Sequence, residues 1–141
     1  MQVNPHLSFK GDCEAAFKFY EQRLGGKIQF LLTYGASPAA KDVSPEWRDK
    51  IIHATLQLGD SILAGVDTPP SHYQDPRGIS LTLETKDPAE AERAFAALAE
   101  GGEVQMALQE TFWAARFGML TDRFGIPWMV NCGKAAQQQS A

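Results

Sequence analysis

The chain has 141 residues, 44% of them hydrophobic, and a formal net charge of −4. This length and composition fit one globular domain with its own core, and the scattered Lys and Arg residues argue against the clustered basic face that nucleic acid needs. No apolar run approaches the ~18 residues of a membrane span, and no signal peptide is evident. We therefore expect a cytoplasmic protein without nucleic-acid or membrane partners, whose Cys13 and Cys132 are free thiols rather than a disulfide.

The first half of the chain predicts a strand, a helix and three more strands. Residues 3–9 alternate between apolar and polar types, as a half-buried strand does. Asp12 then stands where it can cap a helix with apolar residues at helical spacing, which Gly25 and Gly26 end. The three further strands are predicted over residues 27–34, 51–58 and 61–66, and the last two form a hairpin.

The second half repeats this order after a Pro-rich joint. An alternating strand over residues 79–85 precedes an Ala-rich helix over 88–100, which Gly101 and Gly102 end. Three strands follow, over residues 103–108, 115–121 and 127–132, with a turn at 122–125 between the last two. The repeat predicts two βαβββ modules, 1–67 and 78–133, in one domain of residues 1–133 with a flexible tail at 134–141. The expected fold class is α+β, with curved mixed sheets, each under one helix, around a cleft.

The alternation of side chains along each strand predicts which residues line the cleft. Apolar positions such as Phe9, Leu56, Ile79 and Val130 are expected beneath the helices. The opposite faces then receive Asn4, His6, Ser8, Ile51, His53, Thr55, Gln57, Ser80, Thr82, Glu84, Met129 and Asn131. The hairpin near the C-terminus adds apolar walls at Trp113 and Phe117. The predicted cleft is therefore mixed, with two histidines, one carboxylate, amides, hydroxyls and aromatic rings.

Five segments together form a recognisable pattern: Asn4–Phe9, Cys13–Ala16, Phe19–Tyr20, Gln109–Trp113 and Thr121–Asn131. They resemble the vicinal oxygen chelate superfamily, which holds glyoxalase I, bleomycin-resistance proteins and extradiol dioxygenases, and in particular its PhnB-like branch. The resemblance spans residues 1–133 and implies the tandem βαβββ fold. Members of this branch often carry the label 3-demethylubiquinone 3-methyltransferase, but this chain lacks the glycine-rich nucleotide loop that a typical methyltransferase fold requires.

The resemblance also implies a divalent metal held by His and Glu side chains from four strands. Carried across one at a time, the four positions fall at Asn4 or Pro5 beside His6, among Leu63, Ala64 and Gly65, on Gly78, and on Met129. At most one ligand survives, and a thioether at Met129 does not suit Zn²⁺, Ni²⁺ or Fe²⁺. We therefore expect no metal centre and no other cofactor.

Two functions of different classes follow from this cleft. The first is a metal-independent binding protein for a small, partly aromatic or polar ligand. Its expected ligand contacts are His6, His53, Thr55, Trp113, Phe117, Met129 and Asn131. The second is a metal-dependent lyase, isomerase or dioxygenase with a relocated metal site on His6, His53 and Glu84, in which His53 and Glu84 are the candidate catalytic residues. A purely structural role for either histidine also stays open.

We expect a homodimer, because open sheets leave edge strands that need a partner or modules that complement each other. The long loop of residues 35–49 should lie at the rim of the first module. It carries Trp47, which is costly to expose unless it covers an apolar surface. Trp47 is therefore expected either to close over the cleft or the partner subunit, or only to plug the sheet edge of its own module.

Overall fold

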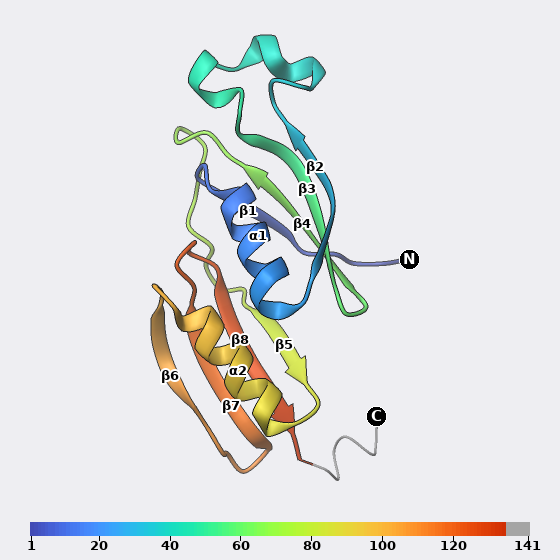
Figure 1. Ribbon diagram of the computed structural model, residues 1–141. Helices are drawn as coiled ribbons and strands as arrows, with labels where there is room; N and C mark the ends of the chain where they lie inside the picture. Colours follow the sequence, from blue (N-terminus) through green and yellow to red (C-terminus); the bar gives the residue numbers. More distant parts are fainter. Residues whose placement is uncertain (135–141) are drawn as a thin grey trace. The chain divides into compact units, whose positions relative to one another are not determined.

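The computed structural model describes residues 1–134 and divides into two compact units, Met1–Gln74 and a second unit that begins at Asp75. Each unit holds one helix and one four-stranded sheet (Figure 1). The α+β class with two tandem βαβββ modules is therefore confirmed. Of the tail expected at residues 134–141, all but Lys134 lies outside the described residues. Among the described helices, none is long and apolar enough to cross a membrane.

The first unit consists of β1 (His6–Phe9), α1 (Cys13–Leu24), β2 (Lys27–Thr33), β3 (Ile51–Leu58) and β4 (Ser61–Asp67). Its sheet has the order β1-β4-β3-β2, with β1 parallel to β4 and the other neighbours antiparallel. Between β2 and β3, the predicted loop forms two short 3₁₀ helices, Pro38–Asp42 and Pro45–Trp47. Its base is closed by the backbone, because Gly35 N donates to Arg48 O at 2.8 Å.

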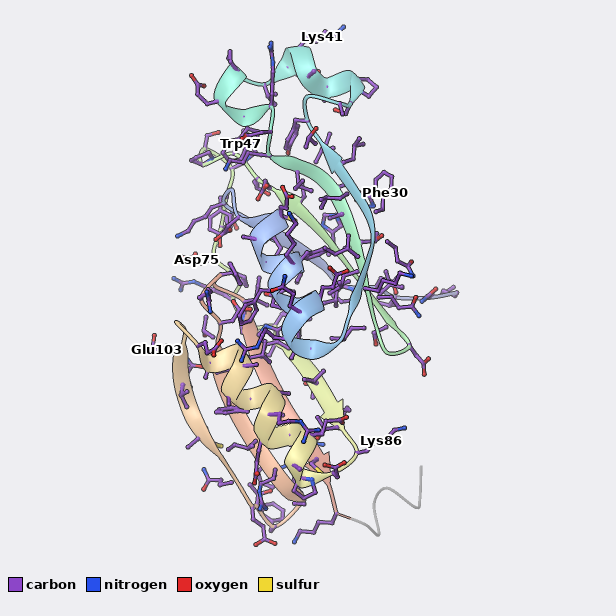
Figure 2. The ribbon with its side chains drawn as sticks, in the orientation of Figure 1. Phe30, Lys41, Trp47, Asp75, Lys86 and Glu103 are labelled. Atoms are coloured by element: carbon purple, nitrogen blue, oxygen red, sulfur yellow. The ribbon has the colours of Figure 1, made fainter. Side chains whose placement is uncertain are left out.

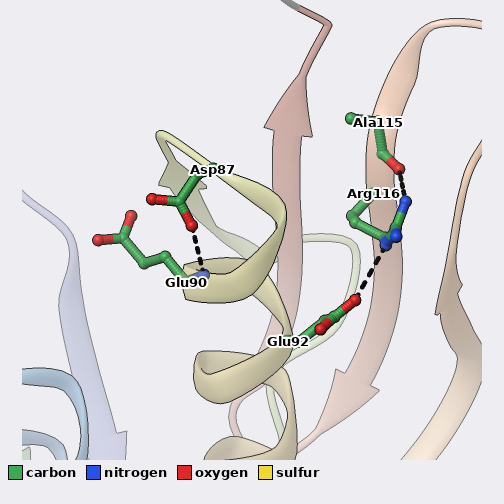
Figure 3. A network of polar contacts seen from close by, with 5 residues as sticks. All are labelled: Asp87, Glu90, Glu92, Ala115 and Arg116. Carbon is green, nitrogen blue, oxygen red and sulfur yellow. Dashed lines mark hydrogen bonds and ion pairs between the residues drawn. The ribbon is translucent and has the colours of Figure 1, made fainter.

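The second unit consists of β5 (Leu81–Thr85), α2 (Pro88–Ala99), β6 (Glu103–Gln109), β7 (Ala114–Thr121) and β8 (Pro127–Gly133). Its sheet order, β5-β8-β7-β6, repeats the topology of the first unit strand for strand. Helix α2 is capped by Asp87, whose carboxylate accepts the backbone N–H of Glu90 at 2.8 Å (Figure 3). This side-chain cap satisfies one of the N–H groups that a helix leaves free at its start.

Each helix lies on its sheet where a strand carries a glycine. A Cβ on Gly65 would stand 2.7 Å from Phe17 Cζ and 3.0 Å from Cys13 Sγ. A Cβ on Gly118 would stand 2.6 Å from Phe95 Cε2. A larger residue at either position would collide with these helix side chains, so the two glycines allow the helix to lie close to its sheet.

The start of α1 is held by a buried aspartate from a distant strand. Asp67 ends β4, and its Oδ1 accepts the N–H groups of Gly11 and Cys13 at 3.0 and 2.9 Å. Its Oδ2 accepts the N–H of Ile51 at 2.8 Å. Asp12 occupies the N-cap position of this helix, as predicted, but its side chain makes no capping hydrogen bond. The carboxylate of Asp67, which is distant in the sequence, accepts the N–H groups at the start of the helix instead. Its three hydrogen bonds offset the cost of burying its charge.

A second buried aspartate fixes the turn between β7 and β8. The Oδ1 of Asp122 accepts the backbone N–H groups of Phe124 and Ile126 at 2.9 and 3.0 Å. Its Oδ2 accepts the indole N–H of Trp128 at 2.9 Å. The carboxylate therefore ties the turn to the core, and the predicted C-terminal hairpin is confirmed.

Strand alternation placed two apolar residues wrongly. Ile79 was expected beneath α2, but β5 begins only at Leu81, and 73% of the Ile79 surface is exposed. Ile51 was expected on the cleft face, but it is fully buried. The reason is a break in register between β2 and β3. Leu32 and Thr33 are consecutive in β2, but their partners His53 and Ile51 are two residues apart in β3, so the alternation fails at the start of β3. Two polar residues expected on cleft strands, Asn4 and Ser80, are exposed and lie outside the strands.

Candidate ligand-binding site

The sheet face of the first unit that is turned away from α1 carries two histidines and an aromatic ring. The register places His6 opposite Ala64, Ala64 opposite Thr55, and Thr55 opposite Phe30, in one row across four strands. The His53 ring stacks on that of His6, with 6.2 Å between centroids and 21° between planes, and lies 5.7 Å from Phe30. Figure 2 shows Phe30 projecting from β2. We call His6, Phe30, His53 and Thr55 the first face.

The corresponding face of the second unit begins with a row of methionines. Met106 lies opposite Met119, and Met119 opposite Met129, on the neighbouring strands β6, β7 and β8. On the far side of Met129 the row ends at Thr82 of β5. Three of the four methionines of the chain thus lie side by side. Their thioethers are soft and flexible, and they adapt to apolar ligands of different shapes.

The next row of this face combines an aromatic ring with a polar pair. Glu84 of β5 lies opposite Asn131, and Asn131 opposite Phe117. Asn131 Nδ2 donates to Glu84 Oε2 at 2.8 Å. The ring of Trp113 meets that of Phe117 edge to face, at 5.4 Å. We call the whole set the second face; it consists of Glu84, Met106, Trp113, Phe117, Met119, Met129 and Asn131.

The residues predicted to bind a ligand therefore fall into two groups. His6, His53 and Thr55 share the first face, and Trp113, Phe117, Met129 and Asn131 share the second. Glu84, a candidate catalytic residue, belongs to the second unit, where it is bonded to Asn131. The alternation of side chains therefore predicted correctly which of these strand residues share a sheet face. Their roles in ligand binding and catalysis stay predictions.

The cysteines take no part in either face. Both are buried and neither forms a disulfide, as the sequence predicts. Burial, and after it the charge of Asp67, raises the pKa of the Cys13 thiol far above its usual range. Because the thiolate is the reactive form, Cys13 is an inert core residue at neutral pH.

The model of the Glyoxalase/Bleomycin resistance protein/Dioxygenase superfamily matches residues 3–130. The chain belongs to this superfamily. It is 35% identical to Protein YjdN of Escherichia coli (strain K12) over 147 aligned positions, which cover 99% of this chain and 100% of that protein. The resemblance read from the sequence motifs is thereby confirmed.

Solved structures of similar proteins agree with this fold. The crystal structure of protein PA1353 from Pseudomonas aeruginosa is 49% identical, covers 94% of this chain and 98% of its own, and superposes with a TM-score of 0.86. The PhnB protein of Bacillus cereus, named as a putative 3-demethylubiquinone-9 3-methyltransferase, is 23% identical with a TM-score of 0.80, over 94% of this chain and 100% of its own. At that identity, the second likeness concerns the fold alone.

The positions at which superfamily enzymes hold their metal do not suit one here. In the first unit, Ala64 lies directly beside His6, so the first two positions offer one imidazole and one methyl group. In the second unit, Gly78 precedes β5, and Met129 offers a thioether. Within either unit of the described chain, no group of three or more His, Cys, Asp or Glu side chains could hold a metal ion. The donor set of residues 1–134 therefore does not fit the usual divalent metal centre.

Sequence reasoning missed three residues of these faces. Phe30 and Met106 were not assigned to a face, because β2 and β6 both contain breaks in register beside these positions, and alternation fails there. Met119 lies on a regular part of β7, so counting back from Met129 across the hairpin turn would have found it.

Proposed function

We propose that this protein binds small molecules on its sheet faces, each face considered within its own unit, and does so without the usual metal centre of its superfamily, as a PhnB-like binding protein. One observation carries the proposal: the positions for metal ligands offer at most one imidazole and one thioether, which is too few for the usual centre, whereas the faces around them keep groups that bind organic ligands. Trp113, Phe117 and Met129 would contact an apolar or aromatic part of the ligand. His6, His53, Thr55 and Asn131 would supply hydrogen bonds.

A homodimer is part of this proposal. Each sheet ends in an edge strand, β2 or β6, whose outer backbone groups have no partner strand within the described chain. Large apolar side chains on these strands are exposed, among them Phe30, Leu31, Val104 and Met106. A second copy would cover such surface and pair such edges. Light scattering at micromolar concentration tests this, because a monodisperse monomer would contradict it.

A metal-dependent lyase, isomerase or dioxygenase is the second candidate. The observation that favours it is the stacked pair His6 and His53, which brings two imidazoles together on an open sheet face. Imidazoles are ligands that divalent transition metals accept.

Elemental analysis of protein purified without an affinity tag separates the two candidates. The binding proposal expects Zn, Ni, Mn and Fe far below one equivalent per chain, in the native protein and in His53→Ala alike. One equivalent of a metal that His53→Ala loses would overturn it and support the enzyme. A thermal-shift screen of small metabolites then tests binding itself, with Trp113→Ala expected to lose any stabilisation that the native protein shows.

A further inference from the structure

We propose that the second face selects organic cations, that is, protonated amines or amidines carried on an apolar or aromatic body. This inference rests on the proposed small-molecule binding and names the chemical class of the ligand. Three features of the second unit support it: a carboxylate without a cation, an amide oxygen without a donor, and a row of thioethers and rings beside them.

The carboxylate is that of Glu84. Its side chain accepts one hydrogen bond, from Asn131 Nδ2, and the described part of the chain gives it no ion pair. Strands β5–β8 contain a single basic residue, Arg116, whose side chain is bonded to Glu92 of α2 and to its own neighbour's carbonyl (Figure 3). The negative charge of Glu84 is therefore left for a ligand, and Asn131 holds the carboxylate in a fixed orientation.

The amide of Asn131 gives the second feature. An ionised carboxylate only accepts hydrogen bonds, so the nitrogen of Asn131 must face Glu84, and its oxygen must point elsewhere. That oxygen, Oδ1, is buried and accepts no hydrogen bond. A ligand group that donates several N–H bonds beside Glu84 could serve both acceptors, which a hydroxyl or a carboxylate could not do as well.

The apolar part of the site gives the third feature. Met119 and Met129 lie one row from Glu84 and Asn131, and the ring of Phe117 stands opposite Asn131 in the same row. A cation is attracted to the face of an aromatic ring, and thioethers pack against apolar groups of varied shape. The site therefore suits a molecule with a positive nitrogen at one end and an apolar body at the other.

The methionines also supply the test. In protein labelled at the methionine methyl groups, three of the four NMR signals report on the second face, and the fourth, from the exposed Met1, is an internal reference. The probes are tryptamine, tryptophol and indole-3-acetate, which share an indole and differ in the charge of the side arm. We expect tryptamine to bind about tenfold more tightly than tryptophol, and indole-3-acetate more weakly than either.

Matched variants show whether Glu84 is responsible for the preference for tryptamine over tryptophol. Glu84→Gln keeps the shape and an acceptor for Asn131 but removes the charge, and it should bring tryptamine and tryptophol to within about threefold of each other. Glu103→Gln removes the other carboxylate of strands β5–β8 and should leave the preference intact. Binding of all three probes with no preference for tryptamine, or a preference that survives Glu84→Gln, would overturn the inference and leave the proposed function standing. If no probe moved any of the three methionine signals, both the selectivity for cations and the proposed binding of small molecules would be contradicted for the second face.

Discussion

The ring of Phe17 in α1 lies so close to Gly65 in β4 that a Cβ on the glycine would stand 2.7 Å from Phe17 Cζ. The helix and the sheet of the first unit meet at this contact, where Cys13 Sγ also lies 3.0 Å from the Cβ position. We expect Gly65→Ala to lower the free energy of unfolding by about 1–3 kcal/mol, since overpacking of a dense core costs that much. Urea unfolding measures it. A double-mutant cycle with Phe17→Leu is the control: the two changes should cost less together than their sum, and strict additivity would contradict the contact as the cause.

The Asp67 carboxylate gives a second prediction about stability. It accepts three backbone N–H groups with its two oxygens, and an amide has only one oxygen to offer. Asp67→Asn should therefore leave at least one buried N–H facing an NH₂ group and cost about 2–4 kcal/mol in urea unfolding. The matched control is Asp60→Asn in the exposed turn between β3 and β4, with an expected change within about 0.5 kcal/mol. Equal effects of the two substitutions would show that Asp67 does not anchor α1.

The order of elements could be predicted from the sequence because its signals are local. Alternation over a few residues marks a strand, and paired glycines mark the ends of both helices. The anchoring role of Asp67 could not be predicted in this way, since its partners Gly11 and Ile51 lie 56 and 16 residues away. Nothing in the local pattern distinguishes it from Asp12, which the sequence favoured as the cap.

The two candidate faces were predictable to the extent that their strands are regular. In β8, an unbroken alternation puts Met129 and Asn131 on one side and Trp128 and Val130 on the other, as expected. In β2, a bulge before Phe30 interrupts the pattern, and the ring beside His53 went unrecognised. A bulge depends on pairing with a distant strand, so it cannot be predicted from the sequence of one strand alone.

The buried thiol of Cys13 predicts a dependence of stability on pH. Burial, followed by the charge of Asp67, raises the pKa of the Cys13 thiol in the folded protein, while a thiol in the unfolded chain has a pKa of about 8.5. Below that pH both states are protonated. Above it only the unfolded chain loses the proton, so the unfolded state gains and stability falls as the pH rises.

We therefore expect the free energy of unfolding of the native protein, measured against that of Cys13→Ala, to fall by about 1–2 kcal/mol between about pH 8 and about pH 10. The substitution itself adds a constant offset, and only the slope is informative. Parallel curves for the two proteins would mean that the thiol ionises as readily in the folded state as in the unfolded state.

The tryptophan of the second face should report ligand binding directly. The Trp113 indole packs edge to face on Phe117, whereas Trp128 is buried and bonded to Asp122. A ligand on this face should therefore change the emission of Trp113 and leave that of Trp128 alone. We expect the fluorescence change produced by phenethylamine, a protonated amine without an indole, to persist in Trp47→Phe and to fall by at least about fivefold in Trp113→Phe. A change that survives Trp113→Phe would place the ligand elsewhere.

The last prediction concerns Trp47, for which the sequence left two roles open. Trp47 could close over the cleft or the partner subunit, or it could only cover the sheet edge of its own module. The indole is half-buried within its own unit, and a Cβ on Gly11 would lie 3.7 Å from Trp47 Cη2, an ordinary packing distance. The segment that carries it is closed at its base by the hydrogen bond from Gly35 N to Arg48 O. Both contacts favour a side chain that packs on the turn between β1 and α1, and it is this turn that Asp67 also holds.

We therefore expect the Trp47 component of the fluorescence, obtained as native protein minus Trp47→Phe, to respond neither to phenethylamine nor to dilution. Trp47→Ala should instead lower the free energy of unfolding by roughly 1–3 kcal/mol, because it removes a half-buried ring from the start of α1. Ala36→Gly, at an exposed position of the same segment, controls for general loosening of the backbone and should cost no more than about 1 kcal/mol. A Trp47 component that shifts on dilution through a dimer transition would show that the residue docks on a partner subunit, and quenching by the ligand would show that it closes over the site.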